Sequence, residues 1–298
     1  VRIIDQKHNQ GTGAARNAIV TYATGKYLFT MDCDDVIIPD CIEILYRKMV
    51  EHPVDFVAAS FVRKDVQGNI YPGGCQYDDV LVEEGDYAVA QYRYGQGKNI
   101  FVATWNKLYR TDFLRKNKIC CVPHYLIDDP WFTYQVIIRA RSCRLISDCT
   151  LFFTYNPLSV TSVKEQDGYT TFLGEQYLGT QRLKADYIYS LAEQPFYPGA
   201  LVDLLKMSLY HLYRVCASSK IAESEKEYFL QSFLEIRFLS PRHWNFMSKN
   251  NAKKNNNYYF PLFMGMGLVF GVILDQIAIG LCLGVAIGLA LDNNKKKK

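Results

Sequence analysis

The sequence predicts an α/β fold with a mixed, mostly parallel sheet, followed by a helical C-terminal region and a Gly-rich membrane segment. Strand and helix patterns alternate through the first 62 residues, an order typical of strands joined by crossover helices. From about residue 172 to residue 239 the pattern is helical and rich in Leu and Tyr. Hydrophobic residues make up 49% and charged residues 21% of the 298 residues, a composition that supports a globular core.

Local patterns and stop signals predict the individual elements. Strands are expected over residues 1–5, 27–31, 54–62, 99–109 and 145–155, and helices over residues 14–24, 40–51 and 129–139. The first two strands are apolar runs, and the helix over 40–51 carries its apolar side chains on one face. Gly25 ends the first helix, Pro53 ends the second, and Pro130 occupies the first turn of the third.

The formal net charge of +4 belongs to the tail of the chain. Residues 241–298 hold eight basic and two acidic residues, whereas the first 240 residues hold 26 basic and 28 acidic residues. A protein that binds duplex nucleic acid places its basic stripe on the folded body, so we expect no nucleic-acid partner. The nine cysteines are odd in number and form no CxxC pair, which predicts reduced thiols in a cytosolic setting and argues against disulfides and structural zinc.

The C-terminal segment differs in kind from the rest. Residues 250–257 form a polar Lys/Asn linker, and two apolar, Gly-rich halves at 260–274 and 277–291 follow it. Their glycines recur at every fourth residue, the spacing at which membrane helices pack closely. Each half would span about 22 Å as a helix, which favours a membrane hairpin with both Lys-rich flanks on the cytoplasmic side. A single membrane helix and a buried soluble helix pair remain alternatives.

A cluster of carboxylates follows the predicted strand at 27–31. Asp32, Asp34 and Asp35 lie within four residues, and open α/β sheets bind ligands at the carboxyl ends of their strands. Hard carboxylate oxygens suit Mg²⁺ or Mn²⁺, with water and substrate phosphates completing the coordination. A solvated acidic turn is the alternative interpretation.

A Gly-containing loop, NQGTGAARN at residues 9–17, precedes the first predicted helix. Such a loop offers backbone N–H groups to anions, and Arg16 adds a forked phosphate donor, although an ordinary capping turn would also explain it. Together with the carboxylates, the pattern NxGxGxARNxxxxxAxGxYxxxxDxDD resembles the nucleotide-sugar-binding half of family-2 glycosyltransferases, which have the GT-A fold.

This resemblance implies a metal-dependent, inverting glycosyltransferase of the hexosyltransferase type. Its donor would be a nucleotide-diphosphate sugar, with a UDP-sugar as the first expectation, and its acceptor a hydroxyl of a glycan or lipid-linked glycan in polysaccharide or glycoconjugate synthesis. The resemblance places Asn9, Gly11, Arg16, Asp32 and Asp34 on the donor side, and it assigns the Mg²⁺ or Mn²⁺ ion to Asp34 with help from Asp32. The oligomeric state is left open.

Two later segments resemble the same family. ATWNKLYR at residues 103–110 resembles the acceptor-side stretch W-x-K-L-Y, which implies acceptor contacts for Trp105 and Lys107, although Trp105 could equally anchor the core. YLIDDPWF at residues 125–132 resembles the Glu-Asp motif whose Asp is the catalytic base. This implies Asp129 as the base and Asp128 as the less favoured candidate, with helix N-capping as the alternative role.

The resemblance covers residues 1–165 and suggests four parts. These are a GT-A-like catalytic domain at 1–165, a helical region at 166–249, the linker at 250–257, and the membrane hairpin with its Lys tail at 258–298. The expected location is the cytoplasmic face of a membrane, with the bacterial inner membrane favoured.

Family members open with strands that this chain lacks, so about 50 residues are expected to be missing, with poor stability and weak activity as the consequence. A nucleotidyltransferase and a catalytically inactive membrane-tethered scaffold are the rival functions.

Overall fold

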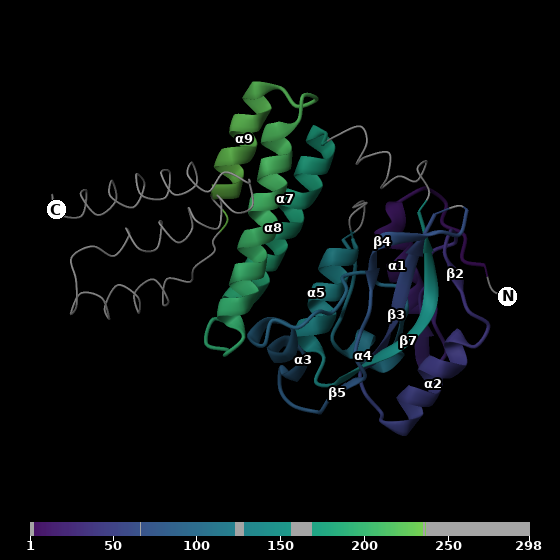
Figure 1. The fold of residues 1–298 in the computed structure, drawn as a ribbon. Coiled ribbons are helices and arrows are strands. Elements are labelled where there is room, and N and C mark those ends of the chain that lie inside the picture. The colour runs from purple at the N-terminus through teal and green to yellow at the C-terminus, as the bar shows by residue number, and fades with distance from the viewer. Residues whose placement is uncertain (1–2, 66, 123–127, 156–168, 235, 237–298) are drawn as a thin grey trace, which may run out of the picture.

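The structure of the protein is a computed structural model that describes residues 3–65, 67–122, 128–155, 169–234 and 236 (Figure 1). The predicted linker at 250–257 and the predicted membrane hairpin at 258–298 lie outside these residues. No helix within the described ranges has both the length and the apolar character needed to cross a bilayer.

Within the described residues, an α/β part is followed by three long helices. The first half of the α/β part contains α1 (Gly11–Tyr22), β1 (Tyr27–Phe29), β2 (Val36–Ile37), α2 (Cys41–Glu51), β3 (Phe56–Lys64), β4 (Ile70–Cys75) and β5 (Val80–Val82). Its second half contains α3 (Ala88–Ala90), η1 (Gln91–Gly95), β6 (Lys107–Arg110), α4 (Thr111–Lys116), α5 (Asp129–Arg139) and β7 (Cys143–Thr154). The long helices are α7 (Thr171–Tyr189), α8 (Tyr197–Ala217) and α9 (Glu223–Leu234).

The sheet is mixed, but the prediction that it is mostly parallel is wrong. Its strands follow the order β1-β6-β3-β7-β2, with β4 paired to β3 and β5 paired to β7. Among the pairings within the described residues, β3 with β7 is parallel, and the others are antiparallel. The reason is that β6 enters between β1 and β3 in the opposite direction, and β3 turns back directly into β4. Strands β1, β3 and β7 still run the same way, so their carboxyl ends share one edge.

Two predicted strands differ from the structure. Residues 3–5 lie outside the sheet, and Ile3 is 84% exposed. The strand predicted over 99–109 is confined to β6, because Asn106 has φ +56° and this left-handed conformation interrupts extended backbone. The side-chain amide of Asn106 donates instead to the carbonyls of Ala59 and Ser60. The helices predicted over 14–24, 40–51 and 129–139 correspond to α1, α2 and α5.

Strand β3 shows how the core is divided between two faces of the sheet. Val57 and Ala59 belong to the smaller cluster, which packs against α2, whereas Phe56 and Ala58 belong to the larger cluster. That larger cluster continues through α5 into the long helices, for example at Leu204 of α8. In Figure 1, α5 lies between the sheet and the pair formed by α7 and α8. The long helices therefore share a core with the α/β part.

Candidate active site

The two aspartates at the start of α5 have different environments. Asp128 is the residue before the helix, yet its side chain makes no capping hydrogen bond. Its carboxylate accepts instead from Arg16 Nη1 at 2.7 Å and from Thr12 Oγ1 at 3.3 Å. Because the Asp128 side chain is only 2% exposed, this is a buried ion pair between α5 and α1, and the N-capping alternative does not describe it.

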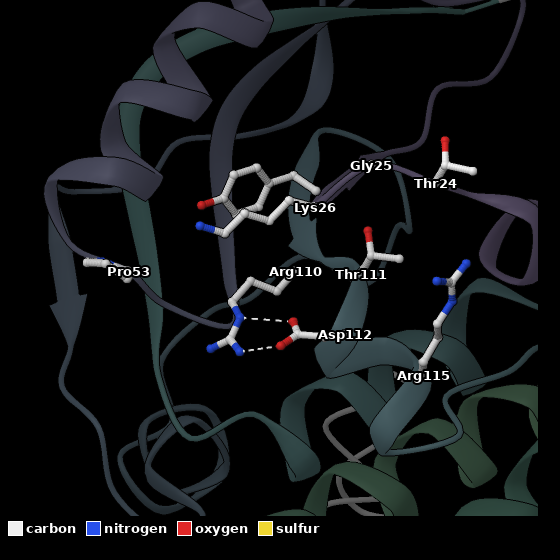
Figure 2. Close-up of a pocket in the computed structure, with 9 residues that line it drawn as sticks. Thr24, Gly25, Lys26, Pro53, Arg110, Thr111, Asp112 and Arg115 are labelled. Carbon is white, nitrogen blue, oxygen red and sulfur yellow. Dashed lines mark hydrogen bonds and ion pairs between the residues drawn. The ribbon is translucent and has the colours of Figure 1, made fainter.

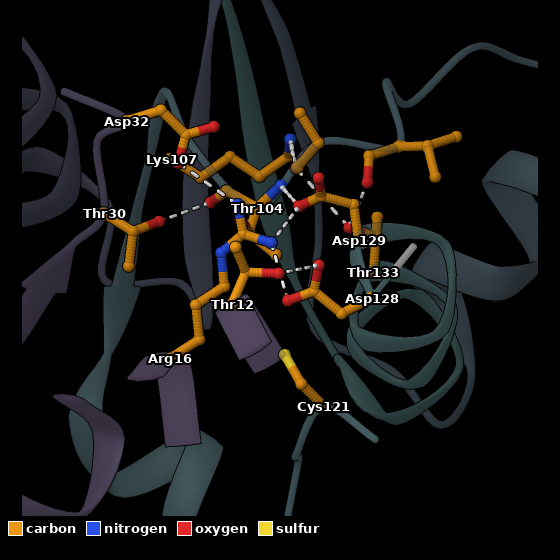
Figure 3. A network of polar contacts seen from close by, with 12 residues as sticks. Thr12, Arg16, Thr30, Asp32, Thr104, Lys107, Cys121, Asp128, Asp129 and Thr133 are labelled. Atoms are coloured by element: carbon orange, nitrogen blue, oxygen red, sulfur yellow. Dashed lines mark hydrogen bonds and ion pairs between the residues drawn. The ribbon is translucent and has the colours of Figure 1, made fainter. Parts of the chain in front are cut away.

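Arg16 joins three carboxylates at one point (Figure 3). Besides Asp128, Nη1 lies 3.2 Å from Asp129 Oδ1, and Nη2 lies 3.1 Å from Asp32 Oδ1. Burial of the guanidinium opposes its charge, but Asp129, Asp128 and Asp32 outweigh burial and raise the pKa of Arg16. Arg16 is therefore a permanent cation that holds the start of α5 beside the turn after β1. Its predicted role as a phosphate donor stays a prediction.

The Gly-containing loop positions Arg16 through close backbone contacts. Gly11 has φ +85°, which favours glycine, and its N–H donates to Asn9 Oδ1 at 2.9 Å. A Cβ on Gly13 would lie 2.6 Å from the carbonyl oxygen of Val122. Asn17 exchanges two hydrogen bonds with the backbone of Cys121, at 2.9 and 2.7 Å. In this structure the loop residues thus start α1 and fasten it to the backbone of Cys121 and Val122.

Asp129 combines fixed geometry with access to solvent. Its Oδ1 accepts from the backbone N–H of Thr104 at 2.9 Å and is paired with Arg16, while 31% of the side chain remains exposed. Burial raises the pKa of Asp129, Arg16 opposes this shift, and the neighbouring charge of Asp128 adds to it. Of the two aspartates, Asp129 is the one that a substrate could reach.

The acceptor-side roles predicted for Trp105 and Lys107 are not supported by their positions. Trp105 is 5% exposed and is enclosed by aromatic rings, including Phe61 at 4.8 Å and Phe153 at 5.6 Å between centroids. Lys107 is 2% exposed and donates to the Ala103 carbonyl at 2.6 Å, and burial lowers its pKa to about 8. Both side chains therefore support the site from beneath, because neither presents an open surface to a sugar.

The carboxylate turn after β1 contains one buried and two accessible aspartates. Asp34 is exposed, and the Asp32 side chain is 43% exposed. Asp35 is buried, its Oδ1 accepts from the Thr154 N–H at 3.3 Å, and its Oδ2 has no hydrogen-bond partner among the described residues. Burial raises the pKa of Asp35 to about 7. No group of three His, Cys, Asp or Glu side chains in the described part of the chain could enclose a metal ion.

Three residues of the site were not predicted individually from the sequence. Thr12 binds Asp128, Thr104 binds Asp129, and Asp35 is buried beside the end of β7. Thr12 and Asp35 belong to the motifs that carry the resemblance, and Thr104 directly precedes Trp105. Their positions in or beside those motifs could have marked them as site residues. Their partners could not be predicted, because a local pattern does not show hydrogen bonds to distant segments.

A hollow lies at the opposite, amino end of β1 (Figure 2). It has a volume of about 770 Å³ and is lined by basic residues that include Arg110 and Arg115. Arg110 forms a two-pronged pair with Asp112, and Arg115 donates to the carbonyls of Val20 and Thr21 in α1. These guanidinium groups serve intramolecular contacts, so the carboxyl edge of the sheet is the better candidate site.

The chain is similar in sequence to known glycosyltransferases. Residues 1–117 match the model of the family described as Glycosyl transferase family 2. Glycosyltransferase GlyG of Streptococcus pneumoniae is 32% identical over 72 residues, which are 24% of each chain. Uncharacterized glycosyltransferase EpsJ of Bacillus subtilis is 22% identical over 179 residues, which are 59% of this chain and 51% of that relative. The chain thus spans between a quarter and a half of the length of these two relatives.

The crystal structure of S. aureus TarS 1-349 in complex with UDP-GlcNAc has a similar fold. The match has a TM-score of 0.50 at 16% identity and covers 98% of this chain and 75% of TarS 1-349. At this identity the likeness concerns the fold alone. Residues 1–117 of the chain therefore resemble glycosyltransferase family 2, within a mixed α/β fold that is GT-A-like.

Proposed function

We propose that the chain is an inverting hexosyltransferase, which moves a sugar from a nucleotide-diphosphate sugar to a hydroxyl acceptor in polysaccharide or glycoconjugate synthesis. The family match and the names of the relatives support sugar transfer over nucleotidyl transfer. The UDP-GlcNAc bound to TarS supports a UDP-sugar as the first donor to test. A glycan or lipid-linked glycan is the proposed acceptor.

The observation that carries this proposal is the fixed but accessible carboxylate of Asp129. Thr104 N–H and Arg16 Nη1 both contact Oδ1, so the carboxylate is oriented while part of it still faces solvent. In the proposed reaction, Asp129 takes the proton of the acceptor hydroxyl as the acceptor oxygen attacks the anomeric carbon. The bond from that carbon to the diphosphate breaks, and a nucleoside diphosphate leaves. A pKa raised by burial makes the carboxylate a stronger base.

Asp128 is proposed as a positioning residue. Its carboxylate is buried against Arg16 and Thr12, so it cannot reach an acceptor without breaking that pair. It fixes the guanidinium that in turn fixes Asp129.

The turn after β1 carries the carboxylates that could serve as protein ligands of a magnesium or manganese ion. Mg²⁺ is usually held by one or two carboxylates together with substrate phosphates, so a cage of three protein ligands is not required. Asp34 and Asp32 are the accessible carboxylates of this turn, and we propose them as the ligands. When bound, the ion would neutralise charge on the diphosphate leaving group.

The proposed function is tested by the release of nucleoside diphosphate from a panel of nucleotide-sugars that begins with UDP-GlcNAc, with Mg²⁺ or Mn²⁺ present. We expect metal-dependent release, which falls by about 10²–10⁴-fold in Asp129→Asn because the general base is lost. Asp112→Asn, at the other end of β1, is the matched control and should retain activity. No release with any donor would refute the transferase function, whereas release of pyrophosphate in a parallel assay with a nucleoside triphosphate and a sugar 1-phosphate would favour a nucleotidyltransferase. Unchanged activity in the cell for Asp129→Asn would favour the scaffold, and NMR of the product anomer tests inversion.

We also propose that the protein acts at the cytoplasmic face of a membrane, in bacteria the inner membrane. The support is the sequence of residues 258–298, with its two apolar Gly-rich halves and Lys-rich flanks. Deleting these residues should move the protein from the membrane fraction to the soluble fraction. A full-length chain that is already soluble would contradict the proposal.

A further inference from the structure

A row of aromatic rings and one guanidinium runs across the larger-core face of the sheet toward the carboxyl ends of β3 and β7. At its inner end the Trp105 ring stacks on Phe153, with centroids 5.6 Å apart and planes 11° apart. Arg63 Cζ lies 5.5 Å from the Phe153 centroid and 4.7 Å from that of Tyr155. At the outer end Tyr155 stacks on Tyr71 at 4.9 Å, with planes 3° apart.

The inner end of this row directly follows, in sequence, the residue that holds the proposed base, and its outer end reaches the protein surface. Trp105 directly follows Thr104, whose N–H holds Asp129, whereas Tyr71 is 41% exposed. The strand register produces the row, since Arg63 pairs with Phe153 on one side and with Tyr71 on the other. We call Arg63, Tyr71 and Tyr155 the outer cluster.

Arg63 has hydrogen-bonding capacity that the described residues do not use. Its Nε is buried and has no hydrogen-bond partner within the described ranges, and Nη1 makes a long contact of 3.5 Å to the carbonyl of Pro72. The structure records no ion pair between Arg63 and another described residue, whereas Arg16 has three carboxylate partners. A guanidinium carries five N–H donors in a fork that matches carboxylates and phosphates, and a buried donor without a partner costs free energy.

We propose that the outer cluster binds an anionic saccharide as the acceptor, with Arg63 pairing its phosphate or carboxylate and Tyr71 packing on its sugar ring. This inference rests on the proposed function, which requires an acceptor. The row adjoins the residues that hold Asp129, and the base must face the acceptor hydroxyl, so the row belongs to the acceptor side. A tyrosine face offers an apolar surface to the C–H groups of a sugar, and the guanidinium supplies charge-assisted hydrogen bonds to the anion.

The test is calorimetric titration of the full chain, without donor, against two matched pairs of probes. Trigalacturonate against galactotriose tests a carboxylate, and maltotriose 6-phosphate against maltotriose tests a phosphate. We expect the anionic member of at least one pair to bind about tenfold or more tightly. Arg63→Gln should abolish that preference, and Arg63→Lys should retain only part of it because the fork is lost. Tyr71→Leu should weaken both members of the pair alike.

Lys64→Gln is the matched control, because it removes one positive charge from the adjacent residue. Lys64 lies over the Phe152 ring at 3.6 Å, and alternation along β3 turns it to the other face of the sheet. The control should keep the anion preference, and Arg63→Gln should keep donor hydrolysis. The inference is overturned if neither anionic probe is preferred, if Lys64→Gln and Arg63→Gln lose the preference equally, or if Arg63→Gln impairs donor hydrolysis instead.

Binding and turnover separate the two proposals. Anion-selective binding by a chain that turns over no nucleotide-sugar would refute the transferase function and leave this site standing as a saccharide site. Turnover of a nucleotide-sugar without preference for either anionic probe would support the transferase function and overturn the anion site.

Discussion

Replacing Arg16 by Met should destabilise the protein because it leaves the buried carboxylate of Asp128 without its ion-pair partner. Asp128 is 2% exposed and Arg16 13% exposed, so their 2.7 Å pair is a buried one. Removing one partner of such a pair costs about 3–5 kcal/mol, since the remaining charge stays desolvated. The contact with Asp32, whose side chain is 43% exposed, adds no more than about 1 kcal/mol. We therefore expect Arg16→Met to lower the free energy of unfolding by about 3–5 kcal/mol.

Urea unfolding of the parent and five variants, namely Arg16→Met, Arg16→Lys, Asp32→Asn, Asp128→Asn and the double variant Arg16→Met/Asp128→Asn, measures this cost. Asp32→Asn should lose less than about 1 kcal/mol, and Arg16→Lys should lose less than Arg16→Met because it keeps the charge but not the fork. The double variant Arg16→Met/Asp128→Asn should be more stable than the sum of its single variants predicts, because the stranded charge is gone. A loss below about 1 kcal/mol for Arg16→Met, or strict additivity in the double variant, would refute the argument that the pair acts as a buried unit.

Two further predictions concern packing and pH. Gly13→Ala should cost about 1–3 kcal/mol in thermal unfolding, because its Cβ would meet the Val122 carbonyl oxygen at 2.6 Å. Gly85→Ala, whose Cβ would meet only Ala88 Cβ at 3.5 Å, should be close to neutral, and equal losses would contradict the clash. Burial first, then the charges of Lys184 and Arg214, lower the pKa of His211 to about 3. Between pH 6.5 and 3 the unfolded chain thus binds a proton at this residue that the folded chain does not. His211 therefore lowers the free energy of unfolding by about 1.4 kcal/mol for each pH unit as the pH falls. His211→Gln should flatten the slope of unfolding free energy against pH by that amount. An unchanged slope would contradict the claim that His211 remains neutral in the folded chain.

Most helices and several strands could be predicted because their signals are local. The apolar face of α2, the Pro at the start of α5 and the stop after α1 all lie within their own segments. The direction of the strands could not be predicted in the same way, because β6 obtains its neighbours from segments that are distant in sequence. Its length depended on the left-handed backbone of Asn106, which is set by hydrogen bonds to β3.

The candidate site shows the same limit at the level of side chains. Arg16 and Asp128 both stood in motifs of the sequence, but 112 positions separate them, and no local pattern states that they form an ion pair. Trp105 was equally open to a core role and a sugar-binding role. The choice depended on Phe61 of β3 and Phe153 of β7, which enclose its ring.

The sequence identified both Asp128 and Asp129 as candidates, but only the structure distinguishes their roles. Adjacent residues at the start of a helix point about 100° apart, so one carboxylate turns toward α1 while its neighbour turns toward Thr104. The buried one is matched to a permanent cation and cannot exchange that partner for a substrate at low cost. The other shares the cation through one oxygen and keeps 31% exposure, which is what a base needs in order to be both oriented and reachable. If this division is correct, Asp128→Asn should lower stability more than Asp129→Asn does, whereas Asp129→Asn should lower turnover more. Unfolding and donor-release measurements on the same two preparations would expose an inverted or equal order.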